Sequence, residues 1–166
     1  MDVAMASQLF EKHSEIIIPE WCDYNGHMNV AFYVLVFDHA TDVFYDTLGI
    51  GREYRDRTNC STFTVESHIT YDGEVLEGDE VRCQTQLLGF DDKRLHYFHR
   101  MHHAAKGYLA ATTEILSIHV DLSVRRVAPM PDDVRDRLAA VLEAHRDLGT
   151  PAEAGRVIEM GSRRKS

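Results

Sequence analysis

The strongest pattern in the chain is a stripe of apolar residues between positions 30 and 48. Its members recur three or four residues apart, so they share one face of a helix. They are Val30, Val34, Phe37, Thr41, Phe44 and Leu48. Gly49 and apolar Ile50 follow, as expected where a helix ends in a left-handed residue backed by a hydrophobic contact. Further apolar residues flank the stripe, so we predict a buried helix that begins between Gly26 and Asn29 and ends near Leu48.

The segments on both sides of this helix carry the alternating or continuous apolar patterns of β-strands. One short strand with three consecutive isoleucines precedes the helix, and four longer strands follow it. Short polar turns between the later strands favour antiparallel pairing. The predicted strands cover residues 13–20, 62–71, 80–90, 94–103 and 108–122.

The strand over residues 62–71 alternates between apolar and polar positions. Neighbouring side chains of a strand point to opposite faces. The pattern therefore predicts Phe63, Val65, Ile69 and Tyr71 on one face of the sheet and Glu66 on the other.

Three segments complete the chain. Residues 51–61 are polar and arginine-rich and are predicted to form a loop, which either is solvated or contacts phosphate groups. Residues 132–148 carry apolar side chains at helical spacing after two prolines, which predicts a second helix. We predict a single domain over residues 1–148 and a polar, loosely held C-terminal tail over residues 149–166.

Charge and composition restrict the classes of partner. A formal net charge of −9 argues against binding to nucleic acid or to an anionic membrane. No apolar run approaches the ~20 residues of a membrane span, and the N-terminus lacks the pattern of a secretory signal. The three cysteines are odd in number and widely spaced, so we expect no disulfide framework. A cytoplasmic protein is predicted.

Four histidines crowd the strand over residues 94–103, namely His96, His99, His102 and His103. Only alternate residues share a face of a strand, so the same-face pairs are separated by about 13 to 20 Å, too far to hold one ion. We therefore predict no metal site and expect these histidines on the sheet surface or at an interface.

A carboxylate, a glycine and an imidazole gather immediately before the long helix, at Asp23, Gly26 and His27. The first turn of a helix presents backbone N–H groups without intrahelical partners and the positive end of the dipole, so an oxyanion can bind there. Asp23 would then face a carbonyl carbon whose oxygen points at those donors, as acyl transfer requires. The alternative is that Asp23 and Asn25 only shape the turn.

Cys22 is a weaker candidate nucleophile beside Asp23. In an extended segment, adjacent side chains point to opposite faces, so Cys22 and Asp23 cannot both face one site. We expect Cys22 to pack in the interior.

The motif Asp23-Tyr24-Asn25-Gly26-His27-Met28-Asn29, with Tyr33, Phe37 and Ala40 after it, resembles the signature of the hotdog-fold acyl-CoA thioesterases related to the 4-hydroxybenzoyl-CoA enzymes. The resemblance extends over residues 15–131. It implies an α+β hotdog fold, in which an antiparallel β-sheet wraps around a long central helix. It also implies a homodimer or dimer of dimers with active sites at the subunit interface. The reaction would be hydrolysis of an acyl-CoA thioester, with coenzyme A as part of the substrate and no separate cofactor.

The resemblance also assigns roles within the motif. Asp23 would act as the nucleophile or as a general base on water, two routes that the sequence does not separate. Backbone donors near residues 27–30 would hold the carbonyl oxygen. His27 would orient the reacting groups or hold the turn, and Asn29 would be a further catalytic residue. Gly26 and Met28 would contact the substrate.

Residues 24–29, 64–69 and 92–101 are most similar to the betainyl-CoA thioesterases of bacterial carnitine catabolism. A trimethylammonium group donates no hydrogen bonds, so its pocket needs aromatic faces or a carboxylate. Trp21, Tyr24 and Glu66 are the candidates for these contacts, against the alternatives of a packed Trp21 and a solvated Glu66.

Two other functions compete with hydrolysis. A hotdog hydratase or dehydratase also uses a carboxylate and a histidine, but its motif commonly has a proline and a longer separation, whereas three residues separate Asp23 from His27. A non-catalytic acyl-CoA-binding module would not need Asp23. The sequence therefore favours hydrolysis.

Overall fold

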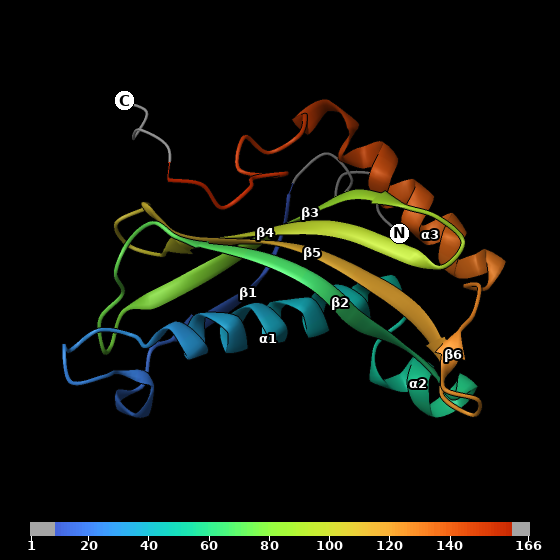
Figure 1. Ribbon diagram of the computed structural model, residues 1–166, viewed down its shortest axis with the longest axis horizontal. Helices are drawn as coiled ribbons and strands as arrows, with labels where there is room; N and C mark the ends of the chain where they lie inside the picture. Colours follow the sequence, from blue (N-terminus) through green and yellow to red (C-terminus); the bar gives the residue numbers. More distant parts are fainter. Residues whose placement is uncertain (1–8, 161–166) are drawn as a thin grey trace.

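The predicted buried helix is α1, Val30–Leu48, in the computed structural model, which describes residues 9–160 (Figure 1). The Asn29 side chain accepts a hydrogen bond from the Ala31 N–H at 3.0 Å, and Gly49 ends the helix with φ of 69°. These two local signals confirm the predicted bounds. Val30 and Val34, by contrast, are 59% and 46% exposed in the single chain, so only the later part of the predicted stripe is buried.

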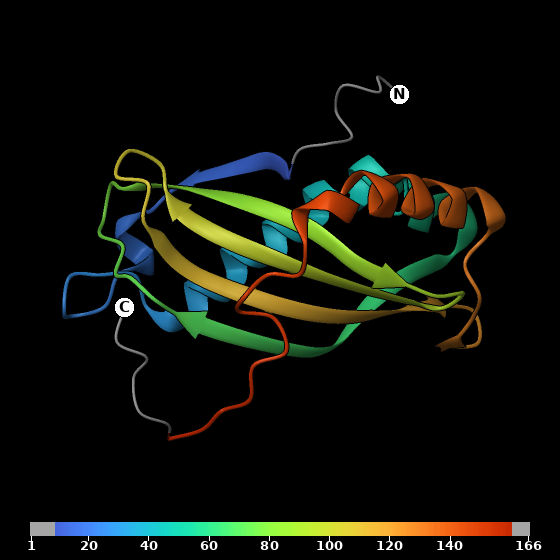
Figure 2. The ribbon, with the colours of Figure 1, turned by 90° about the horizontal axis from the view of Figure 1, so that it is seen from above.

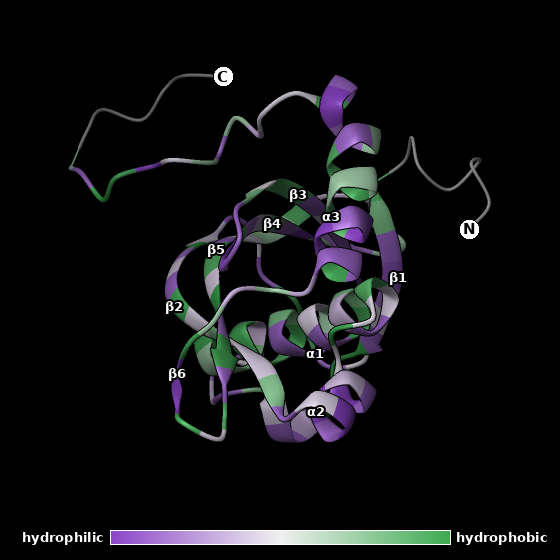
Figure 3. Ribbon diagram, turned by 90° about the vertical axis from the view of Figure 1, so that its right-hand side faces the viewer, coloured by the Kyte–Doolittle hydropathy of each residue, from purple (hydrophilic) through white to green (hydrophobic). Residues whose placement is uncertain are grey.

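A single antiparallel sheet curls around α1, and its strands form an arc when the helix is viewed end-on (Figure 3). The strand order is β1-β3-β4-β5-β2, with the short β6 paired to β5. The strands are β1 Phe10–Ile16, β2 Cys60–Tyr71, β3 Glu80–Phe90, β4 Arg94–His103, β5 Leu109–Asp121 and β6 Arg126–Val127. This architecture confirms the predicted α+β fold with a sheet wrapped around a central helix.

β1 lies a few residues earlier in the sequence than predicted. It ends at Ile16, because Pro19 opens the 3-10 helix η2, Pro19–Trp21. Proline has no N–H to donate to a neighbouring strand. The last isoleucines therefore lie beyond the strand, and Ile17 packs into the core at 1% exposure.

A β-bulge in β2 changes which side chains share a face. Thr64 pairs with Ser117 and Glu66 with Leu116, so Val65 is the extra residue. Ser117 lies on the inner face, where the Tyr45 hydroxyl of α1 donates a hydrogen bond to it. The predicted alternation is therefore wrong across the bulge. Phe63 lies on the outer face with Glu66, and Ile69 and Tyr71 lie on the inner face.

The arginine-rich segment predicted as a loop is instead helix α2, Arg52–Thr58. Its single large aromatic side chain, Tyr54, is 4% exposed, and its hydroxyl hydrogen-bonds Nε2 of His119 on β5 at 2.8 Å. This contact fastens the helix to the sheet.

The C-terminal region begins with the predicted helix, α3 Asp132–Ala144, followed by the 3-10 helix η3, Arg146–Leu148. The chain then crosses the outer face of the sheet (Figure 2). Gln86 donates to the Gly149 carbonyl at 2.7 Å, and Arg100 pairs with Glu153 at 3.1 Å. The first part of the predicted tail is thus held on the sheet, and residues 161–166 lie outside the described part of the chain.

Two of the four clustered histidines are buried, so the expectation that they lie on the sheet surface or at an interface is wrong for these two. His99 is fully buried on the inner face, and its ring nitrogens hydrogen-bond the hydroxyls of Thr41 at 2.9 Å and Thr85 at 2.8 Å. His103 is 3% exposed, and its Nδ1 accepts hydrogen bonds from the backbone N–H groups of Ala105 and Lys106 at 3.2 Å. Buried polar groups are tolerated when they have such partners. His96 and His102 lie on the outer face, partly exposed, as the alternation predicts.

We expect His99 to make stability depend on pH. Burial lowers the pKa of His99 from 6.5 to about 3, with the charge of His13 as a smaller cause. The unfolded chain therefore binds one more proton than the folded protein between these values. The contribution of neutral, buried His99 to the free energy of unfolding is fully present above pH 6.5. It is lost as pH falls below this value, by up to about 1.4 kcal/mol per pH unit. The free energy of unfolding, measured with urea, should fall less between pH 7 and pH 5 for His99→Gln than for wild type. Equal decreases in the two proteins would show that His99 is not the source of this pH dependence.

Among residues 9–160, no helix combines the length and the apolarity that crossing a bilayer requires.

Candidate active site

The residues before α1 form a tight hairpin turn that leads directly into the helix. Cys22 and Met28 pair as a β-bridge. The Asp23 N–H donates to the His27 carbonyl at 3.1 Å, and the Gly26 N–H donates to the Asp23 carbonyl at 3.0 Å. Gly26 has φ of 82°, a left-handed conformation that glycine adopts without strain. The turn therefore needs the glycine for its shape, whatever the substrate.

The Asp23 carboxylate has one oxygen engaged and one free. Its Oδ1 accepts a hydrogen bond from the Asn25 N–H at 2.8 Å. Its Oδ2 has no hydrogen-bond partner among residues 9–160. Asp23 is half-buried. It thus shapes the turn, as one interpretation predicts, and keeps an oxygen for chemistry, as the other requires.

The structure shows which of the backbone N–H groups at residues 27–31 already have an acceptor and which remain free for an oxyanion. The Met28 N–H donates to Val75 at 2.8 Å, the Asn29 N–H to Trp21 at 2.9 Å, and the Ala31 N–H to the Asn29 side chain. The N–H groups of His27 and Val30 have no acceptor among the described residues. Val30 is the first residue of α1, where the dipole favours negative charge. These two donors are the ones available to a carbonyl oxygen.

Three other motif residues serve the structure of the turn. Asn29 caps α1 with its side chain. Met28 is 2% exposed and belongs to the hydrophobic core, so its side chain packs inside the protein. His27 bridges to Leu76 through its backbone and is half-buried.

Cys22 packs against the core, as predicted, and its thiol is held neutral. Burial raises the pKa of Cys22, and the nearby carboxylates of Glu77 and Asp23 raise it further. A thiolate is the reactive form of cysteine. All three cysteines are free thiols in the single chain.

The aromatic residues beside the turn differ in their surroundings. Trp21 stacks on Phe32, with ring centroids 5.7 Å apart and planes at 15°, so one face of the indole is already covered. Tyr24 is 98% exposed at the tip of the turn. The structure therefore leaves Tyr24 open to a ligand and Trp21 with one covered face.

Glu66 is not brought to this turn within the chain. It projects from the outer face of β2, whereas the turn that holds Asp23 leads into α1, which packs on the inner face of the sheet. The end of β2 that meets the start of α1 is Tyr71, whose ring contacts Tyr33 at 5.3 Å. A role for Glu66 in this site would require a second subunit.

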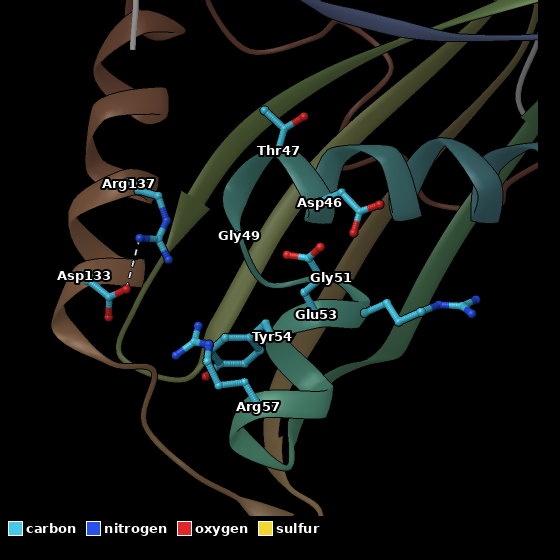
Figure 4. A pocket seen from close by; sticks show the side chains of 10 residues that line it. Asp46, Thr47, Gly49, Gly51, Glu53, Tyr54, Arg57, Asp133 and Arg137 are labelled. Atoms are coloured by element: carbon cyan, nitrogen blue, oxygen red, sulfur yellow. Dashed lines mark hydrogen bonds and ion pairs between the residues drawn. The ribbon is translucent and has the colours of Figure 1, made fainter.

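A hollow of about 730 Å³ lies at the opposite end of α1. Figure 4 shows residues from the end of α1, from α2 and from α3 around it, including Tyr54, Arg57 and the ion pair of Arg137 with Asp133. A helix of 19 residues spans about 28 Å. This hollow is therefore remote from Asp23 and is lined by both arginine and acidic side chains.

Comparison with known proteins gives consistent matches. The model of the thioesterase-like superfamily matches residues 17–138. A betainyl-CoA thioesterase from Pseudomonas aeruginosa is 43% identical over 92% of this chain and 96% of that protein. A hypothetical protein from Staphylococcus aureus, solved in complex with CoA, is 27% identical with a TM-score of 0.87 over 93% of this chain and 97% of that one. A proposed thioesterase from Pseudomonas putida KT2440 is 36% identical with a TM-score of 0.80 over 93% and 99%.

Proposed function

We propose that this chain, which belongs to the thioesterase-like superfamily and hydrolyses acyl-CoA thioesters, acts on betainyl-CoA. The observation that carries the proposal is 43% identity to a betainyl-CoA thioesterase over nearly the whole of both chains. The reaction would belong to carnitine catabolism, as the resemblance of the sequence implies. The family match and this relative favour hydrolysis over the hydratase and over the non-catalytic binding module.

The turn before α1 offers the groups that thioester hydrolysis needs. The thioester carbonyl oxygen would accept hydrogen bonds from the free N–H groups of Val30 and His27. Asp23 Oδ2 would then face the carbonyl carbon from the adjoining turn. The negative charge that develops on the oxygen is stabilised by these donors and by the positive end of the α1 dipole.

Two routes use the same carboxylate. As a general base, Asp23 takes a proton from water while the water oxygen attacks the carbonyl carbon. The tetrahedral intermediate then breaks its C–S bond, and the CoA thiolate leaves and takes up a proton. As a nucleophile, Asp23 would attack the carbonyl carbon, the C–S bond would break as the CoA thiolate leaves and takes up a proton, and water would hydrolyse the resulting mixed anhydride to the free acid and the Asp23 carboxylate. His27 would orient the reacting groups in either route, and Asn29 would support them by fixing the start of the helix.

Recognition of the acyl group would rely on aromatic faces. A trimethylammonium group gains about 1–2 kcal/mol from each well-placed ring in a partly dry pocket. Tyr24 presents an exposed ring, and Trp21 presents the indole face that Phe32 leaves uncovered. The backbone around Gly26 would let the acyl group approach closely.

The test of this recognition is a paired measurement on two substrates. Replacing Trp21 by Leu should lower kcat/KM for betainyl-CoA about tenfold more than for 3,3-dimethylbutyryl-CoA, which has the same bulk without the charge. A packing defect would lower both alike. Wild-type enzyme that hydrolyses the neutral isostere as fast as the cation would refute cation recognition and leave thioester hydrolysis intact.

We also propose a homodimer formed along β2, alone or as half of a dimer of dimers. β2 is an edge strand of 12 residues, and Phe63, Val65 and Tyr71 on it are exposed. An edge strand of this length normally pairs or is covered. Val30 and Val34 of α1 are also exposed, and a second subunit would bury them. Sedimentation should give a dimer at micromolar concentration, and a monomer would refute the proposal.

A cytoplasmic location remains our proposal. Its support is that Cys22, Cys60 and Cys83 are all free thiols, as expected in a reducing compartment.

A further inference from the structure

Three side chains that commonly bind metals meet between β1 and α1. His13 and Glu15 lie two residues apart on β1, and their partners across the sheet, Cys83 and Val81, are core residues. Both side chains therefore face the helix side of the sheet. His39 reaches them from α1, with its Nδ1 2.7 Å from Glu15 Oε1. One ligand atom from each residue lies within 4.8 Å of the others.

Two of these ligand atoms are buried without a hydrogen bond. His13 Nε2 and Glu15 Oε2 are 3.3 Å apart but do not have hydrogen-bond geometry, and neither has another partner among the described residues. A buried polar atom without a partner costs roughly 1–3 kcal/mol. An ion between the three groups would satisfy both atoms at once, which a chain of hydrogen bonds does not do here.

We propose that His13, Glu15 and His39 bind one Zn²⁺ ion, with water as the fourth ligand. Two imidazoles and a carboxylate are a donor set that suits Zn²⁺. Zinc–ligand distances of about 2.0–2.2 Å place tetrahedral ligand atoms about 3.4 Å from one another. In this structure His39 Nδ1 lies 2.7 Å from Glu15 Oε1, and His13 Nε2 lies 3.3 Å from Glu15 Oε2. One ligand atom of each of the three residues lies within 4.8 Å of the others, which is the scale of separation that a shared ion needs.

The ion would join the edge strand β1 to the central helix. His39 lies nine residues after Val30, which is about 14 Å along the helix axis. The site is therefore away from the free donors beside Asp23, and its effect would be on stability. It is independent of the proposed betainyl-CoA activity.

The sequence pattern predicts no metal site, because the histidines clustered on one strand are too far apart to share an ion. The ligands proposed here come from two elements separated by more than twenty residues, and their spacing matches no metal motif. Only the packing of α1 against β1 brings His39 to the other two.

The experiment is calorimetric titration of the full-length chain with ZnCl₂, after removal of any affinity tag and of bound metal. We expect one saturable site per chain and a raised melting temperature with Zn²⁺. His39→Gln and Glu15→Gln should each weaken binding at least tenfold and remove most of the gain in melting temperature.

His96→Gln is the matched control. His96 lies 2.7 Å from Glu114 and is thus another histidine–carboxylate pair on the sheet. Its loss should leave Zn²⁺ affinity unchanged. Absence of saturable binding by wild type would overturn the proposal even if a variant folds poorly. Equal affinity in wild type and in both ligand variants, or a loss seen only in His96→Gln, would overturn it as well.

Discussion

Asp23→Asn should lower kcat for acyl-CoA hydrolysis at least a hundredfold without lowering the melting temperature. The Asn side chain keeps an oxygen that can accept the Asn25 N–H, so the turn retains the hydrogen bond seen at 2.8 Å. The amide neither attacks a carbonyl nor takes a proton from water effectively. The measurement is release of free CoA thiol under saturating substrate.

Asp38→Asn provides the matched control for this variant. Asp38 is an exposed carboxylate on α1, and its replacement makes the same change in net charge. This variant should retain near wild-type turnover. Full activity in Asp23→Asn, or equal losses in the two variants, would rule out Asp23 as the reacting carboxylate.

Val30→Pro should lower kcat about a hundred- to a thousandfold, the usual effect of removing one oxyanion donor. The substitution deletes the Val30 N–H, which has no acceptor among residues 9–160. Proline is well tolerated at the first position of a helix. Asn29, with φ of −67° and ψ of 146°, already has the extended conformation that a following proline requires. The helix should therefore form as before.

Val30→Ala is the control that separates backbone from side chain. It shortens the side chain and keeps the N–H, so turnover should stay within a few-fold of wild type, and sedimentation should show that the proposed dimer is retained in both variants. Circular dichroism and melting curves establish that both variants fold. If Val30→Pro is as active as Val30→Ala, the carbonyl oxygen does not bind at the start of α1.

Elements that depend only on neighbouring residues follow from the sequence alone. Asn29 and Gly49 set the ends of α1, because a cap and a left-handed residue act within one turn of the helix. The turn that holds Asp23 is local in the same sense, since the hydrogen bonds that join Asp23 to Asn25, Gly26 and His27 span at most four positions. Only its last residues also bond to the remote segment at Val75 and Leu76. The amino-acid sequence therefore suffices to predict the bounds of α1 and the turn that carries Asp23.

Long-range packing establishes which polar groups are buried and which residues meet across the fold. His99 is accommodated inside because Thr41 and Thr85 supply partners, and the hydroxyl of Thr41 lies 58 residues away in sequence. The polar segment around Tyr54 is attached to the sheet through the hydrogen bond of Tyr54 with His119, 65 positions later in sequence. The bulge at Val65 puts Phe63 on the outer face of β2, whereas strict alternation would put it on the same face as Ile69 and Tyr71.

The same holds for the chemistry of single groups. The Met28 N–H is occupied because Val75, which is remote in sequence, supplies a carbonyl, and His39 joins His13 and Glu15 only through packing of α1 on β1. Hydrophobic periodicity is repeated along the chain and can be read from it. A buried polar atom, by contrast, needs a specific hydrogen-bond partner at bonding distance. In a curled sheet that partner comes from a remote part of the sequence, so only the tertiary structure identifies it.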